Sequence, residues 1–217
     1  MITLLLVDDH PLLRQGVAQL IEMEEGLQVI GEAASGEEAI GKALSLDPDM
    51  ILLDLNMKGM SGIETLKAMR AQGITSRIVV FTMSDADDDV ISALKAGADG
   101  YLLKDCEPEE LLPALRQAAN GQQVFSPKLA QIMAGALRGN IANSTYKPSE
   151  LTSRELEIIK LLAQGKPNKL IARELNITEA TVKVHVKNLL KKLSLNSRLE
   201  AALWAISNKL ATVENPG

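Results

Sequence analysis

The sequence has very little cysteine, since among 217 residues only Cys106 carries a thiol. An internal disulfide and a cysteine metal cluster are therefore excluded, and such a chain is typical of a reducing cytosol. The sequence also lacks any apolar run near the roughly 18 residues that a bilayer-spanning helix needs. No basic segment followed by an apolar stretch opens the chain. We therefore expect a cytoplasmic protein without membrane insertion.

The overall composition is ordinary, but charge separates the chain into two halves. Hydrophobic residues make up 46% and charged residues 24%, which excludes disordered and collagenous chains, and the length favours two domains. Residues 1–125 contain 21 acidic and 9 basic residues, a net of −12, whereas 126–217 contain 7 and 14, a net of +7. This asymmetry suggests that one half handles cations or phosphate and the other approaches a polyanion such as nucleic acid. Solvated faces of unequal sign are the simpler alternative.

In the acidic half, short apolar runs alternate with longer amphipathic stretches. The runs are continuous, as expected for strands that helices cover on both faces. They predict strands at 2–7, 27–31, 50–53, 77–81 and 100–103, with helices near 11–24, 36–46, 62–72, 86–96 and 107–120. Five strand–helix units in succession predict a doubly wound α/β fold with a parallel sheet.

Polar residues stand where four of these strands end. The runs stop at Asp8 and Asp9, at Asp54, at Thr82 and at Lys104. Because the carboxyl ends of parallel strands share one edge of the sheet, we expect these side chains in a single crevice. Each has a local alternative, such as an aspartate capping the next helix or a threonine chosen for strand propensity. The complementary chemistry of the whole set favours a site.

Three carboxylates in one crevice repel each other unless one keeps its proton or a cation lies among them. Ligands that are all oxygen favour Mg²⁺ over zinc, which prefers His or Cys. His10 is adjacent, but its position at a helix start favours a structural role. With the metal bound, Lys104 and Thr82 can neutralise and hydrogen-bond a phosphoryl group. Asp54 can then be the nucleophile that forms an aspartyl phosphate.

Over about residues 2–121 the sequence resembles the receiver domain of two-component response regulators. The resemblance lies in the strand-end residues and in two segments, DLNMKGMSG at 54–62 and GADGYLLK at 97–104. It implies a flavodoxin-like domain in which Asp54 accepts a phosphoryl group from a sensor histidine kinase. It implies no dedicated enzyme, beyond removal of the domain's own phosphoryl group.

The same resemblance implies the ligands of the metal ion. Asp9, Asp54 and the backbone carbonyl of Asn56 would bind Mg²⁺, and Asp8 would hold it through water. An aspartate-nucleophile phosphohydrolase is the alternative with related chemistry. Such enzymes usually need a second carboxyl group two residues after the nucleophile. Here that residue is Asn56, which cannot exchange a proton.

Three further roles follow from the resemblance to receiver domains. Lys104 would bind the phosphoryl group, and Thr82 would be drawn toward it. Tyr101 would be the aromatic switch that turns inward as Thr82 moves. These roles predict a domain that changes conformation when it is phosphorylated.

The basic half shows signals for short helices joined by tight turns. Thr152 begins a capping box, Pro167 opens a second helix, and Thr178 caps a third helix over about 179–193. The second and third helices are separated by only a three-residue turn. This arrangement predicts a helix-turn-helix.

The third helix of this half has an apolar side and a basic side. The apolar side has the spacing of a buried stripe, whereas the other side repeats a lysine every fourth residue, at Lys183, Lys187 and Lys191. Residues 166–198 contain 8 basic and 2 acidic residues, enough for several phosphate contacts. A solvated lysine face is the simpler interpretation. Because these lysines lie on the second helix of a helix-turn-helix, we instead expect their face to read the major groove of DNA.

Over about 148–210 the sequence resembles the LuxR-type DNA-binding domain, in the segments LTSRE at 151–155, GKPNKLIA at 165–172 and ITEATVKVHVKNLLKKL at 177–193. The resemblance implies that Lys183, Val184 and Lys187 contact base edges. Candidates for contacts with the DNA backbone are Asn168, Lys169, Thr181, His185 and Lys191. A last helix is expected over 198–210, with Trp204 in the core and part of its apolar stripe pairing with a second copy.

As a whole the sequence resembles the NarL/FixJ-type response regulators, and most of all the nitrate/nitrite regulators. This implies a receiver domain at 1–121, a linker with a helix at 122–147 and a DNA-binding domain at 148–217. The implied partners are a sensor histidine kinase, double-stranded DNA, a second copy on DNA and RNA polymerase. At rest the acidic domain is expected to lie across the basic helix. A phosphorylation-independent DNA-binding protein with a non-switching receiver is the alternative, and a pure signalling adaptor is a weaker one.

Overall fold

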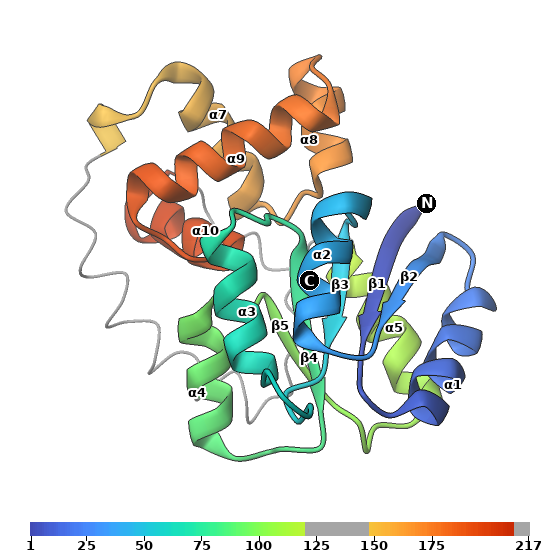
Figure 1. The fold of residues 1–217 in the computed structure, drawn as a ribbon. Helices are drawn as coiled ribbons and strands as arrows, with labels where there is room; N and C mark the ends of the chain where they lie inside the picture. Colours follow the sequence, from blue (N-terminus) through green and yellow to red (C-terminus); the bar gives the residue numbers. More distant parts are fainter. Residues whose placement is uncertain (120–147, 211–217) are drawn as a thin grey trace.

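The computed structural model describes residues 1–119 and 148–210, which form an α/β unit and a helical unit (Figure 1). The α/β unit contains one parallel sheet with strand order β2-β1-β3-β4-β5. This is the doubly wound, flavodoxin-like arrangement that the alternating pattern predicts. The strands are β1 (Ile2–Val7), β2 (Leu27–Ala33), β3 (Met50–Leu53), β4 (Arg77–Thr82) and β5 (Gly100–Leu103).

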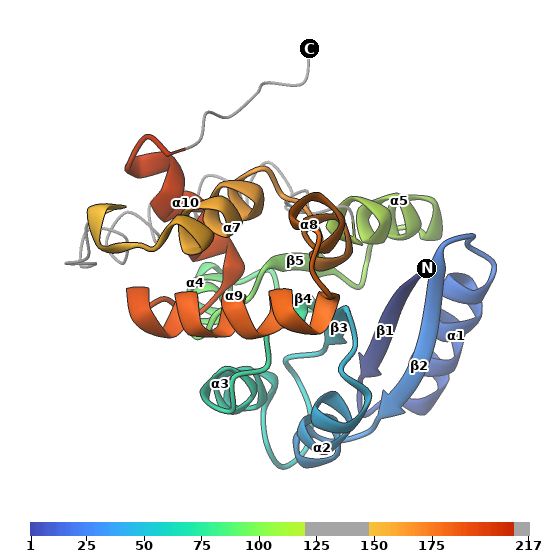
Figure 2. The same ribbon diagram turned by 90° about the horizontal axis from the view of Figure 1, so that it is seen from above.

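The helices of this unit cover both faces of the sheet, as the continuous apolar runs require. One core cluster joins alternate strand residues to α2, α3 and α4, and the other joins the remaining strand residues to α1 and α5. Figure 2 shows the two layers on either side of the strands. The helices are α1 (Pro11–Glu22), α2 (Gly36–Leu46), α3 (Gly62–Ala71), α4 (Asp87–Ala96) and α5 (Pro108–Ala119).

The element boundaries differ from the sequence prediction by one or two residues, with a physical reason in β2. The predicted end at Gly31 is wrong, because the pairing of β1 with β2 shifts register between Leu4 and Leu5. After this irregularity β2 continues to pair, so that Ala33 lies opposite Val7. An irregularity of this kind depends on the partner strand and leaves no local pattern.

The start of α3 approaches the end of β3 so closely that only glycine fits there. A Cβ atom at Gly62 would lie 2.1 Å from the backbone oxygen of Asp54. Ser61 caps the helix in a capping box with Glu64, so the chain enters α3 at a defined angle. Gly62 and this cap therefore fix the loop that follows Asp54.

The helical unit contains a short 3₁₀ turn, η1 (Pro148–Glu150), and four helices over the part of the chain described. The predicted capping box at Thr152 is confirmed. Pro167 precedes its helix rather than lying in the first turn. Trp204 is 1% exposed in the core, as predicted. The helices are α7 (Ser153–Ala163), α8 (Asn168–Leu175), α9 (Glu179–Leu193) and α10 (Arg198–Ser207).

Two predictions on the later part of the chain have different outcomes. The last helix was expected to reach Leu210 but ends at Ser207, because Lys209 has a positive φ of 57° that stops the helix. The linker helix expected within 122–147 lies outside the described residues. In the described ranges, no helix is both long and apolar enough to cross a membrane.

The cap of α9 yields a testable prediction about stability. The Thr178 hydroxyl accepts a hydrogen bond from the backbone N–H of Thr181 at 3.1 Å. We expect Thr178→Ala to lower the free energy of unfolding by about 1 kcal/mol, because the first turn then loses its acceptor. Thr178→Asn keeps a capping oxygen and is the matched control. Urea unfolding measures both, and equal losses in the two variants would contradict the cap's contribution.

Candidate functional site

The four strand-end positions converge at the carboxyl edge of the sheet. The Lys104 ammonium lies 2.7 Å from Asp8 Oδ2 and 2.7 Å from Asp54 Oδ2, so it joins the ends of β1, β3 and β5. The side chains of Lys104 and Asp54 are only 4% and 2% exposed. A buried ammonium between two carboxylates is held by strong charge-assisted contacts.

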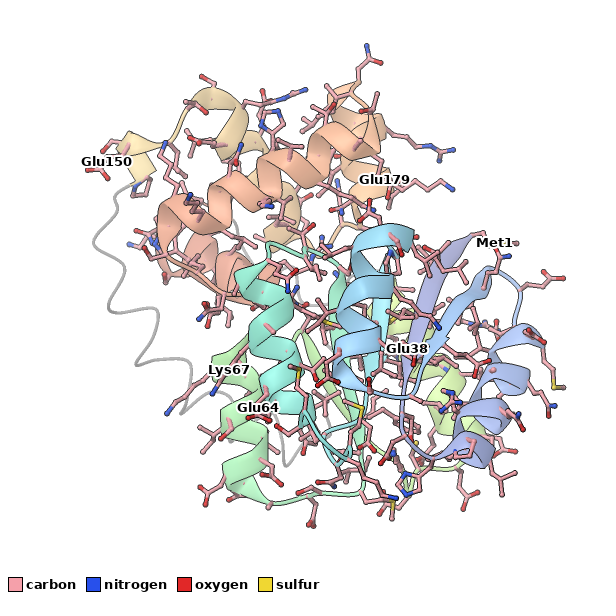
Figure 3. The ribbon with its side chains drawn as sticks, in the orientation of Figure 1. Met1, Glu38, Glu64, Lys67, Glu150 and Glu179 are labelled. Carbon is pink, nitrogen blue, oxygen red and sulfur yellow. The ribbon has the colours of Figure 1, made fainter. Side chains whose placement is uncertain are left out.

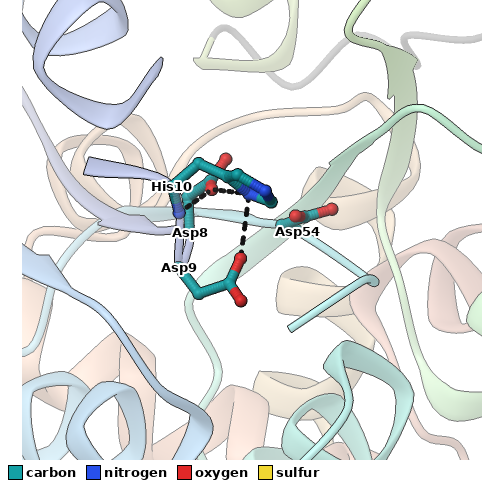
Figure 4. Close-up of side chains that lie close together, drawn as sticks. All are labelled: Asp8, Asp9, His10 and Asp54. Carbon is teal, nitrogen blue, oxygen red and sulfur yellow. Dashed lines mark hydrogen bonds and ion pairs between the residues drawn. The ribbon is translucent and has the colours of Figure 1, made fainter. Parts of the chain in front are cut away.

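Asp9 and His10 complete a cluster on the same edge, which Figure 4 shows together with Asp8 and Asp54. The ligand atoms of these four residues all lie within 4.8 Å of one another. Asp9 Oδ2 accepts a hydrogen bond from the backbone N–H of Lys58 at 3.1 Å. Three carboxylates at this spacing, with Lys104 as their cationic neighbour, have the oxygen-rich donor set that suits a hard divalent ion.

The aspartates before α1 do not cap that helix, which was the local alternative for Asp8 and Asp9. Neither Asp8 nor Asp9 caps it, since Asp8 Oδ1 accepts the N–H of His10 at 2.7 Å and the N-cap residue His10 forms no side-chain cap. The imidazole of His10 lies instead 2.9 Å from Asp9 Oδ1, with a side chain that is 68% exposed. His10 thus contacts its sequence neighbours Asp8 and Asp9, and a structural role rather than metal binding stays the prediction for it.

Thr82 and Tyr101 meet at one residue of the loop after β4. The Thr82 hydroxyl accepts a hydrogen bond from the N–H of Ser84 at 3.3 Å, and the Asn56 amide donates to the same hydroxyl at 3.4 Å. Tyr101 is fully buried, and its hydroxyl donates to the carbonyl of Ser84 at 2.9 Å. Burial, with Asp89 as a secondary cause, raises the pKa of Tyr101 to about 12. A movement of Thr82 would therefore reach Tyr101 through Ser84.

Two of the three residues that define the basic face of α9 (Lys183, Val184 and Lys187) contact the α/β unit through their ammonium groups, whereas Val184 is 57% exposed. Lys183 Nζ lies 2.7 Å from the carboxylate of Asp47, just after α2, and 3.1 Å from its backbone carbonyl. Lys187 Nζ lies 3.5 Å from the carbonyl of Gln72, just after α3. Figures 1 and 2 show α9 lying across this end of the unit. In this arrangement both lysines are engaged by the α/β unit.

Further contacts bury the start of α9 and of α8. Glu179 lies above the end of α2 (Figure 3), where burial and the neighbouring Asp49 raise its pKa. Asn168, a candidate for a contact with the DNA backbone, is only 9% exposed. Of the other candidates, Lys169 and Lys191 are exposed, whereas Thr181 and His185 are partly buried.

Helix α10 also contacts the α/β unit. Leu199 and Leu203 pack against the core cluster of that unit, and the N–H of Leu199 donates to Asp99 Oδ1 at 3.3 Å. Asp99 in turn binds Arg70 at 2.7 Å. Part of the stripe that was expected to pair with a second copy is thus covered by the same chain.

The two sites lie at opposite edges of the sheet. Strand β4 has Thr82 at one end and Arg77 at the other, and β5 runs from Asp99, next to α10, to Lys104 in the acidic cluster. The sequence analysis did not identify Asp47, Gln72 or Asp99 as contact residues. Only the net charges of the two halves indicated such a contact, because the partners are more than 90 residues apart in the chain.

Comparison with known proteins identifies the family to which each unit belongs. Residues 4–116 match the response regulator receiver domain, and residues 149–205 match the bacterial regulatory proteins of the luxR family. The chain is 57% identical over 208 residues to the nitrate/nitrite response regulator protein NarL of Escherichia coli strain K12, with 96% of each chain covered. It is 50% identical to NarP, a nitrate/nitrite response regulator protein of the same strain, with 94% of each covered. The solved structure of response regulator ChrA from a heme-sensing two-component system is 31% identical, with a TM-score of 0.50 and coverage of 96% of this chain and 98% of that chain.

Proposed function

Since the chain belongs to the NarL/FixJ-type response regulators, which are phosphorylation-activated transcription regulators of two-component systems, we propose how its own residues couple phosphorylation to DNA binding. Asp54 accepts the phosphoryl group, and the occluded basic face of α9 is released. The observation that carries this proposal is the contact of Lys183 and Lys187 with the α/β unit, whose opposite edge holds Asp54.

The acidic cluster supports transfer to Asp54 from the phosphohistidine of a sensor kinase. Asp9, Asp54 and the backbone carbonyl of Asn56 would hold Mg²⁺, with Asp8 bound through water, and the ion would neutralise the incoming phosphoryl oxygens. In the structure Lys104 pairs with Asp8 and Asp54. It is therefore placed to move its ammonium to the phosphoryl group once that group occupies Asp54. Slow self-dephosphorylation would occur at the same site.

Transmission to the distant interface starts at Thr82. Its hydroxyl would turn toward the phosphoryl group and leave Ser84. The ring of Tyr101 already lies inward in this structure, so the expected inward turn is replaced here by a change in its hydrogen bond to the carbonyl of Ser84. The other ends of β4 and β5 carry residues next to α8 and α10, so a shift of these strands reaches the helical unit. The closed arrangement, in which α9 and α10 contact the α/β unit, and an open arrangement, in which these contacts are lost, form a two-state equilibrium. Phosphorylation shifts this equilibrium toward the open arrangement.

In the open arrangement Lys183, Val184 and Lys187 would contact base edges. Lys169, Thr181, His185 and Lys191 would contact the DNA backbone, joined by Asn168 once it is uncovered. Leu199 and Leu203 would then become available for a second copy, giving a homodimer on paired half-sites. We further propose domain limits of 1–121 and 148–217, contact with RNA polymerase, and, from the names of the two relatives, a role in nitrate- or nitrite-responsive gene control.

A fluorescence anisotropy titration of promoter DNA with the full-length protein tests this function. We expect a gain in affinity with a small-molecule phosphodonor and Mg²⁺, and no gain when EDTA replaces the metal. Equal binding under all conditions would support the alternative of a phosphorylation-independent DNA-binding protein.

The ion pair at Asp47 gives a separate prediction about the resting state. Asp47→Asn removes the charge opposite Lys183, and asparagine tolerates the positive φ of 47° at this position. We expect DNA affinity of the unphosphorylated protein to rise up to about five-fold, the range for an exposed ion pair. The phosphorylated protein should be unaffected. Glu37→Gln, at the other end of α2, is the matched control, and an equal rise in both variants would refute the role of this contact.

A further inference from the structure

A cavity lies between the two units, at the edge of the sheet away from Asp54. It encloses about 290 Å³, counted with its opening to solvent, and residues of both units line it. Arg77 at the start of β4 and Arg198 at the start of α10 both line it, one from each unit. Nothing in the DNA-binding mechanism requires two arginines in this place.

Both arginines are buried, and the carboxylate whose charge acts on them, that of Asp99, is ion-paired with Arg70 instead. Arg77 is 7% and Arg198 9% exposed. Among residues 1–119 and 148–210, Arg77 donates to the carbonyl of Ala118 and Arg198 donates to the carbonyl of Lys166 at 2.8 Å, and each guanidinium has no second hydrogen bond there. In the described ranges neither forms an ion pair. A guanidinium has five N–H donors and stays protonated, so most of the donors of these two residues are unused.

The nearby acidic groups are engaged elsewhere. Asp99 forms its ion pair with Arg70, and the Asp49 carboxylate on the cavity wall accepts two hydrogen bonds from Thr3. Burial, followed by the positive charge of Arg77, lowers the pKa of Arg198 to about 9. Among the described residues, the two guanidinium groups therefore lie side by side without an ion-paired carboxylate of their own.

The start of α8 adds donors to the same wall. Its N-cap residue is Pro167, which offers no side-chain cap, so the first N–H groups of the helix lack a capping acceptor. Asn168 is 9% exposed, lines the cavity, and its Oδ1 has no hydrogen-bond partner. Because amide oxygen and nitrogen are interchangeable by a half-turn, this side chain can present an NH₂ group instead. An uncapped helix start beside two guanidinium groups is a favourable place for an anion.

We propose that this cavity binds a small inorganic oxyanion, bridged by Arg77 and Arg198, and that the ion stabilises the closed arrangement of the two units. Planar guanidinium forks match oxyanions with paired hydrogen bonds. The site exists only while α8 and α10 lie against the α/β unit, so the ion binds the closed form and not the open one. This inference therefore rests on the closed form of the proposed function.

Strand β4 connects the oxyanion site to the phosphorylation site. It carries Arg77 at one end and Thr82 at the other, about 17 Å apart for five steps of 3.3 Å along the strand. Since phosphorylation favours the open form, it must weaken oxyanion binding. By thermodynamic reciprocity the oxyanion must weaken the response to phosphorylation by the same factor.

Isothermal titration of sulfate, nitrate and phosphate into the full-length protein at constant ionic strength tests the site. We expect saturable binding of at least one ion with a dissociation constant of about 1 mM or tighter. Arg198→Gln should raise the dissociation constant of that ion about ten-fold or more, since a charged donor pair is lost. Arg173→Gln removes the same charge from an exposed position on α8 and should leave the dissociation constant unchanged. No saturable binding, or equal binding by both variants, would overturn the proposal.

A second measurement does not depend on the variants' folding. Crystals of the wild-type protein grown with selenate should show an anomalous selenium peak between the Arg77 and Arg198 guanidinium groups, and a peak only elsewhere would refute the site. Phosphorylation should weaken the calorimetric affinity at least five-fold, and an unchanged affinity would refute the stabilising role. If the ion binds but a phosphodonor leaves DNA binding unchanged, the gating function fails while the oxyanion site stands.

Discussion

Replacing Asp54 by asparagine is expected to abolish the gain in DNA affinity that a phosphodonor produces. Couplings between sites in one protein typically change affinity 5- to 150-fold, and the variant should lose all of it. An amide has no anionic oxygen to attack the phosphorus atom and is a poorer metal ligand. Anisotropy titrations with and without phosphodonor measure the effect, and intact mass spectrometry reports the phosphoryl group.

A control must separate lost chemistry from altered packing, because Asp54 also pairs with Lys104. Asp105→Asn makes the same change at an exposed position one residue beyond Lys104 and should keep the full response. Thermal melts establish whether each variant is folded. Retention of the gain by a folded Asp54→Asn protein would show that the acceptor lies elsewhere.

The second large effect is expected from replacing Lys183 and Lys187 together by alanine. Loss of two contacts in the major groove should cost about 2 to 4 kcal/mol, roughly 30- to 1000-fold in affinity for the phosphorylated protein. The phosphorylated state is the one to measure. In the resting state the same lysines contact Asp47 and Gln72, so the substitution also releases the helix.

Lys160→Ala, an exposed lysine on α7, is the control for the loss of positive charge. Comparison of promoter DNA with a scrambled duplex locates the contacts. If the lysines contact bases, discrimination between the duplexes falls in the double variant, whereas an equal loss on both would place them on the phosphate backbone. An unchanged affinity for both duplexes would exclude this face of α9 as the DNA contact.

The sequence predicted the five strands, the helices of the α/β unit and the helix-turn-helix because their signals are local. Continuous apolar runs, helical spacing and caps such as Thr152 and Thr178 act within a few residues of the chain. The convergence of Asp8, Asp54 and Lys104 was also predictable, since parallel strands bring their carboxyl ends to one edge whatever their exact order. The prediction was wrong at the end of β2, where the register of pairing shifts, and at the end of α10, where Lys209 has a positive φ.

The sequence by itself therefore determined the two folds, the acidic cluster and the opposite charges of the two halves. Only the tertiary structure decided which surfaces meet: Lys183 on Asp47, Leu199 on the core of the α/β unit, and Arg77 and Arg198 at one cavity. The reason is physical. Secondary structure and strand-end sites follow from short-range periodicity, whereas a contact between units depends on shape and charge over residues far apart in the chain, for which one sequence contains no periodic signal.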